Sequence, residues 1–133
     1  MEEKWYLENT NNLNQMLRVR DDIDIPQTIK EFSHLVLITH QYHTADGTMF
    51  PDAACIAFFT AFENNHLESL EEENKVALLA VDINEGVMQF YLYSKDPDKT
   101  VYDCIDFLKT NDLYRCDFEI IKNDKGERLN SLI

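Results

Sequence analysis

The sequence predicts an α+β fold: a ferredoxin-like βαββαβ antiparallel sheet with two helices on one face, preceded by an N-terminal β-hairpin. The first observation is the order of apolar patterns between residues 33 and 121, which reads strand, helix, strand, strand, helix, strand. The second is a turn at residues 84–86 that is short enough to join the two middle strands as a hairpin. Two right-handed split β-α-β units in this order pair into one four-stranded antiparallel sheet.

Size and composition predict a single domain over residues 1–133. The 133 residues are 44% hydrophobic, which is ample material for one core. The three glycines and three prolines lie at the edges of apolar segments. We divide the domain into a hairpin and connector (1–32), the ferredoxin-like core (33–122) and a tail (123–133).

The N-terminal part is expected to be a hairpin with a polar connector. Residues 4–8 and 13–20 have strand character, and the asparagine-rich stretch between them is typical of a turn. Residues 21–26 are polar, and residues 27–32 are expected to add one short helical turn.

The first half of the core predicts a buried strand and a long helix. Residues 35–42 are apolar and β-branched, as in a largely buried strand. After a loop at 44–50, apolar side chains recur at steps of three and four and form one helix face. These side chains are Cys55, Phe59, Phe62, His66 and Leu70. The acidic run at 71–73 opposes the helix dipole and marks the helix end.

The second half predicts strands at 75–82 and 87–94, a helix and a last strand. Asp96 is placed to cap a helix that begins at Pro97. Val101, Cys104, Ile105 and Leu108 then follow the i, i+3, i+4, i+7 spacing of a helix that lies on the core. Residues 114–120 alternate strictly, as in a half-buried strand. The polar tail is expected to be loose. The alternative is that its apolar residues dock, namely Leu129, Leu132 and Ile133.

Alternation along 87–94 assigns the two faces of the sheet. Met88, Phe90 and Leu92 are expected under the helices, so Tyr91 and Tyr93 are expected on the face that no helix covers. Three alternatives exist for this face: the N-terminal hairpin pairs with the sheet or packs on it, two copies stack as a homodimer, or RNA bases stack on the tyrosines. The charge of the chain disfavours RNA.

The net charge of the chain indicates which class of partner it favours. Twelve basic and twenty-five acidic residues give a net charge of −13, which repels nucleic acid and anionic membranes and favours a basic protein partner. The acidic residues that we expect to form docking patches are Glu68, Glu71, Glu72, Asp103 and Asp106. No leader-like start and no membrane-spanning stretch are seen, so a cytoplasmic protein is expected. Three cysteines without C-x-x-C spacing are interpreted as reduced core thiols.

The candidates for chemistry are His40 and His43. Residues three apart on a strand point to opposite faces, so a shared metal ion would require the strand to end between them. Solvated or hydrogen-bonded histidines are the favoured interpretation. No phosphate-binding loop, dinucleotide fingerprint or nucleophile elbow occurs, so we predict no cofactor, no metal and no catalytic residue.

Four segments resemble a bacterial family catalogued as a domain of unknown function, number six-nine-five. They are the loop at 44–52, the acidic-ended helix after it, the aromatic strand that runs into Asp96-Pro97, and the alternating strand at 114–120. The family looks related to ribonuclease E inhibitor B proteins, small acidic ferredoxin-like domains that bind an enzyme. The resemblance therefore implies an inhibitory role.

Two functional hypotheses follow. In the first, the protein is a non-enzymatic regulatory module whose acidic surface docks on a basic partner such as a nuclease or toxin. In the second, it is a small-molecule-binding protein or enzyme with a pocket between sheet and helices or at a homodimer interface, lined by His40, His43, Tyr91 and Tyr93.

Overall fold

The computed structural model describes residues 5–8, 10, 13–42, 44–48, 50–73, 75–108 and 116–132. These residues form a six-stranded antiparallel sheet and four helical segments, which confirms the predicted α+β class. The strands are β1 Trp5–Leu7, β2 Gln15–Arg20, β3 His34–Gln41, β4 Val76–Asn84, β5 Val87–Ser94 and β6 Cys116–Ile121. The helical segments are α1 Ile25–Glu31, the continuous run α2 Ala53–Ala61, η1 Phe62–Leu67 and α3 Glu68–Glu72, then α4 Pro97–Leu108 and α5 Glu127–Leu132.

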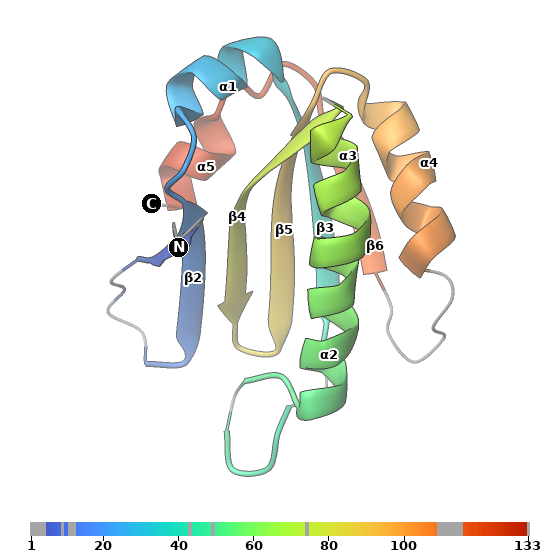
Figure 1. Cartoon of the computed structure of the whole chain (residues 1–133). Coiled ribbons are helices and arrows are strands. Elements are labelled where there is room, and N and C mark those ends of the chain that lie inside the picture. Colours follow the sequence, from blue (N-terminus) through green and yellow to red (C-terminus); the bar gives the residue numbers. More distant parts are fainter. Residues whose placement is uncertain are drawn as a thin grey trace.

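The strand order in the sheet is β1-β2-β4-β5-β3-β6, and every neighbouring pair is antiparallel. The predicted N-terminal hairpin is confirmed, because β1 pairs with β2. It joins the sheet through β2 at the edge of β4 (Figure 1). The hairpin therefore extends the sheet from four strands to six and does not lie over its face.

One face of the sheet is covered by the α2–α3 run and by α4, as predicted (Figure 1). Met88, Phe90 and Leu92 are buried against these helices. The middle of the long helix is wound as a π-helix, so Phe62 and Leu67 lie on the same buried side although they are five residues apart. Leu67 is not part of the helix face that the spacing of three and four residues predicts. The wider π turn brings it to the buried side, so it belongs to the core.

The second face carries helices too, so the prediction of an open face is wrong. Helices α1 and α5 lie over it, and a second core forms between them and the sheet. Ile29 of α1 and Leu129 of α5 pack in this core with Tyr91 and Tyr93. The prediction of a loose tail is also wrong: the docking alternative holds for Leu129, while Ile133 lies outside the described residues.

Local signals explain both covering helices. Asp24 caps α1 by accepting a 3.1 Å hydrogen bond from the backbone N–H of Gln27, so the helix starts two residues before the predicted position. Asp124 accepts hydrogen bonds from the backbone N–H groups at the start of α5. Gly126 has a φ of +84°, and a Cβ there would lie 2.7 Å from Ile29 Cδ1, so glycine allows α1 and the α5 loop to touch.

Candidate functional site

Tyr91 and Tyr93 point away from α2 and α4, as predicted, but they are buried in the second core. Their exposed fractions are 5% and 0%. Burial raises the pKa of both phenols, and a hydrogen bond to Asp124 raises that of Tyr93 further. Neither ring is accessible to a partner or a second copy, so this face offers no stacking surface.

His40 is fully buried beneath α2. Its Nε2 lies 3.8 Å from Cys55 Sγ, its Nδ1 lies 3.7 Å from Cys116 Sγ, and its ring packs on Phe59 at a centroid distance of 4.4 Å. The two sulfurs face different nitrogens of one ring, so they cannot converge with it on one metal ion. Residue 43, the second predicted histidine, lies outside the described residues.

The thiols of the first core are unsuited to nucleophilic chemistry. Burial raises the pKa of Cys104 to about 12 and that of Cys116 to about 12. A reactive cysteine requires the thiolate, which such groups do not form near neutral pH. Over the residues that the structure describes, no group of three His, Cys, Asp or Glu side chains could hold a metal ion.

The three predicted acidic residues of α3 have different environments. Glu72 is exposed and Glu68 is half-buried. Glu71 Oε1 accepts a 2.7 Å hydrogen bond from Arg20 Nη1 and a 2.8 Å hydrogen bond from the backbone N–H of Leu78. Glu71 therefore connects α3 to β2 and β4. Its carboxylate stabilises the fold and is not a free surface charge.

Helix α4 presents a mixed apolar and acidic surface, which we call the α4 outer face. It consists of Asp98, Tyr102, Ile105 and Asp106, with the exposed Lys99 at its border. Tyr102 is 69% exposed and Ile105 is 40% exposed, while the two aspartates are exposed beside them. Spacings of three and four residues place these side chains on one side of the helix. Asp103, the other predicted acidic residue of α4, is half-buried. The prediction that Ile105 faces the core is wrong, because Cys104 and Leu108 take the buried side of the helix and Ile105 lies outside it.

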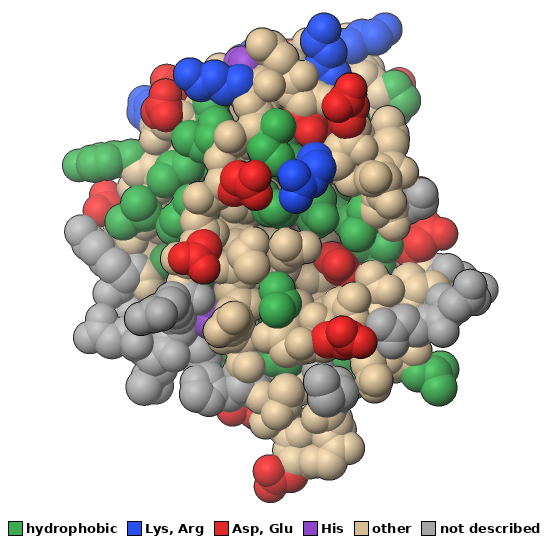
Figure 2. Space-filling model, turned by 180° about the vertical axis from the view of Figure 1, so that it is seen from behind, with side chains coloured by type: hydrophobic (Ala, Val, Ile, Leu, Met, Phe, Trp, Pro, Cys, Tyr) green, Lys and Arg blue, Asp and Glu red, His purple; other side chains and the backbone are tan. Residues whose placement is uncertain are grey.

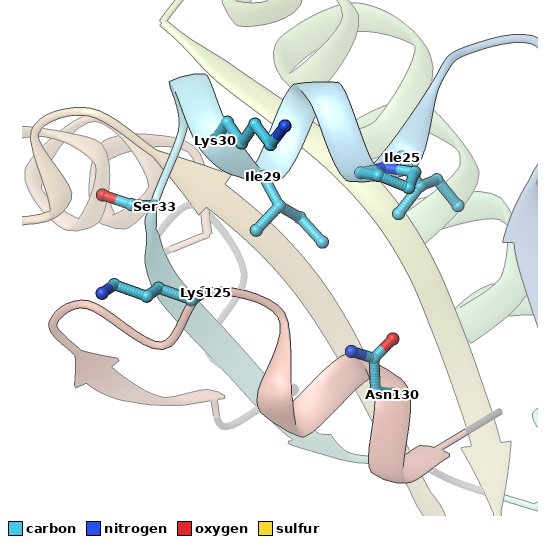
Figure 3. Close-up of a pocket in the computed structure, with 7 residues that line it drawn as sticks. Ile25, Ile29, Lys30, Ser33, Lys125 and Asn130 are labelled. Carbon is cyan, nitrogen blue, oxygen red and sulfur yellow. The ribbon is translucent and has the colours of Figure 1, made fainter.

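A cavity of about 440 Å³ lies between α1 and α5 on the second face. Its lining residues are Ile25, Pro26, Ile29, Lys30, Ser33, Lys125 and Asn130. In the close-up, Ile29 reaches from α1 and Asn130 from α5 into the space between the helices (Figure 3). On this face, acidic side chains are spread widely, whereas the visible basic ones gather in the upper half, at the α1 end (Figure 2).

A family model described as a family of unknown function (DUF695) matches residues 3–130. The chain belongs to this family. No curated protein matches the chain significantly, and no solved structure does. The DUF695 match includes the N-terminal hairpin, α1 and most of α5. These elements are therefore part of the family's domain, and the cavity between α1 and α5 lies within it.

Sequence reasoning missed two features of this DUF695 member: Tyr102 on α4 and the cavity. The available signal for the cavity was the pair of short amphipathic stretches, with Ile25 and Ile29 at i, i+4 and with Leu129 and Leu132 at i, i+3. Across the described part of the chain, no helix has the length and hydrophobicity required to cross a membrane.

Proposed function

We propose that the protein is a non-enzymatic binding module that docks on a basic protein partner through the α4 outer face. The observation that carries the proposal is the exposure of Tyr102 and Ile105 between Asp98 and Asp106, on a chain with a net charge of −13. A tyrosine at the centre of a patch is the residue type that dominates binding energy at interfaces. Surrounding carboxylates steer a basic partner and speed its association.

We further propose that the core follows the ferredoxin-like plan and that the partner is an enzyme such as a nuclease or toxin. The strand order β4-β5-β3-β6, with a helical connection after β3 and after β5, supports the ferredoxin-like topology. The resemblance to ribonuclease E inhibitor B proteins supports the class of partner, because those proteins act by binding an enzyme. Docking would block the active site of the partner by occupying its basic surface.

The test starts with affinity capture from lysate and continues with the purified partner. We expect a basic protein whose association rate falls about tenfold or more between low and high salt. Tyr102→Ala is expected to weaken binding by at least about tenfold, the effect of a central aromatic anchor. Asp98→Asn with Asp106→Asn should mainly slow association.

The matched control is Asp117→Asn with Glu119→Gln on β6, which removes the same two charges from exposed positions outside α4. A partner whose affinity responds equally to both pairs would show general charge attraction and would refute the α4 outer face as the docking site. Binding of a partner that is unaffected by Tyr102→Ala would refute it as well.

A further inference from the structure

We propose that the cavity between α1 and α5 binds a small amphipathic carboxylate, a molecule with an aliphatic body and one anionic end. This ligand site is independent of the α4 outer face. The apolar part of its lining consists of Ile25, Pro26 and Ile29. The polar part consists of Lys30, Lys125, Ser33 and Asn130 (Figure 3).

The charge of the lining is opposite to that of the chain. Acidic residues outnumber basic ones by twenty-five to twelve, yet the lining contains two lysines and no carboxylate. Neither Lys30 nor Lys125 forms an ion pair within the described residues. Both lysines are exposed, and in Figure 3 Lys30 runs along α1 while Lys125 extends away from Ile29 and Asn130. Each side chain therefore has to turn toward the cavity to form a charge-assisted hydrogen bond with an anion.

Two acidic neighbours of the lysines make their contacts outside the cavity lining. Glu31, which follows Lys30, pairs with Lys95 at 3.1 Å. Asp124, which precedes Lys125, accepts a 2.7 Å hydrogen bond from the buried Tyr93 hydroxyl. Glu127, two residues after Lys125, is exposed, and no carboxylate lines the cavity itself, so the charged groups that an anion meets in the lining are the two lysines.

The size of the cavity and its apolar wall favour a small organic anion over an inorganic one. A volume of about 440 Å³ is within the range of sites for small organic ligands. The isoleucine side chains gain nothing from a hydrated inorganic ion, whereas an aliphatic chain removes their surface from water. A neutral aliphatic molecule would use the same apolar wall but leave the lysines without a counter-charge.

Lys125 offers a variant that separates binding from folding. Its φ is +54°, a left-handed conformation that costs lysine roughly 1 kcal/mol and that asparagine tolerates better. Lys125→Asn is therefore expected to remove the ammonium group while leaving the melting temperature equal or higher. Weaker ligand binding by this variant could not be attributed to a damaged fold.

The experiment is an NMR titration of the ¹⁵N-labelled full chain with octanoate, with 1-octanol as the neutral analogue. We expect saturable shifts of the amides of Ile25, Lys30, Ser33, Lys125 and Asn130, with a dissociation constant of about 1 mM, the scale for a ligand of about ten non-hydrogen atoms. 1-Octanol is expected to bind at least about fivefold more weakly, because it lacks the charge that the lysines attract.

Two lysine variants and one control complete the test. Lys125→Asn and Lys30→Gln should each weaken octanoate binding at least about threefold. Lys122→Gln removes the same charge from an exposed site outside the cavity and should leave the affinity unchanged. Absence of saturable shifts at the lining amides, equal affinity for octanoate and 1-octanol, or an equal loss in Lys122→Gln would each overturn the proposal.

Discussion

The Tyr93 hydroxyl donates a 2.7 Å hydrogen bond to Asp124 Oδ2 inside the second core. The same carboxylate oxygen accepts a 3.1 Å hydrogen bond from the backbone N–H of Gly126, where α5 begins. One side chain thus connects the central strand β5 to the helix that closes the second face. The contact links residues 31 positions apart in the sequence.

Removal of the Tyr93 hydroxyl tests this connection. Tyr93→Phe leaves a buried carboxylate with one donor fewer, so we expect the free energy of unfolding to fall by about 1–3 kcal/mol. Urea denaturation followed by circular dichroism measures the change. Tyr91→Phe is the matched control, because the Tyr91 hydroxyl makes no hydrogen bond to any described residue and its loss should cost less. Equal losses in the two variants would contradict the role of the Asp124 contact.

A second prediction concerns Asp82, which is buried in β4. Burial raises the pKa of its carboxyl, partly opposed by a 2.8 Å hydrogen bond from Gln15 Nε2. The folded state therefore binds the proton of Asp82 more tightly than the unfolded state does. As the pH rises from about 4 through the raised pKa, the buried carboxyl loses this proton and the free energy of unfolding falls. Asp82→Asn should be more stable than the original protein at pH 7, with a gain that shrinks toward zero at acid pH.

Parallel urea titrations of the two proteins between acid and neutral pH measure this difference. Since both proteins contain all the other carboxyl groups, the pH dependence of the difference between their unfolding free energies comes from Asp82 alone. A difference that stays constant with pH would contradict the assignment.

The acidic residues of α3 give a third prediction, because Glu71 and Glu72 carry the same charge in different environments. Glu71→Gln weakens the contacts with Arg20 and with the Leu78 N–H, so we expect a loss of about 1–3 kcal/mol in unfolding free energy. Glu72→Gln at an exposed position should change it by less than about 0.5 kcal/mol. Thermal melts of both variants compare the two, and similar melting temperatures would refute the structural role of Glu71.

The turn between β4 and β5 gives a fourth prediction. Glu85 and Gly86 both have positive φ, 51° and 88°, as in a type I′ hairpin turn that favours Asn-Gly. Glu85→Asn should raise the free energy of unfolding by roughly 0.5–1 kcal/mol, because asparagine adopts this conformation more easily. Glu85→Gln is the control, because it removes the same charge but glutamine does not adopt the positive φ more easily than glutamate. A comparable gain in the glutamine variant would point to charge rather than to backbone conformation.

The element order and the first core could be predicted from the sequence because both depend on local periodicity. The alternation of Met88, Phe90 and Leu92 with Tyr91 and Tyr93 placed the two sets on opposite faces, as observed. The capping signals of Asp96 and Pro97 likewise predicted the start of α4.

The helices that cover the second face were only partly predictable from periodicity. Ile25 with Ile29 and Leu129 with Leu132 have helical spacing, but α1 and α5 are each too short for this spacing to show which face of the sheet they cover. Their position depends on contacts between distant residues, such as Ile29 with Gly126. A second signal was available in the sheet itself. Strand β4 reads as a nearly continuous apolar run from Val76 to Val81, and such runs are typical of strands covered on both faces.

The position of α5 has a consequence for the order of events during synthesis. Tyr91, Tyr93 and Leu37 leave the ribosome well before α5, and α5 supplies Leu129 to the core that buries them. On the nascent chain, these side chains stay exposed to water and to other chains until the segment after Lys122 emerges. Any delay in translating the segment that contains α5 prolongs the interval in which the uncovered second face can cause aggregation or bind a chaperone.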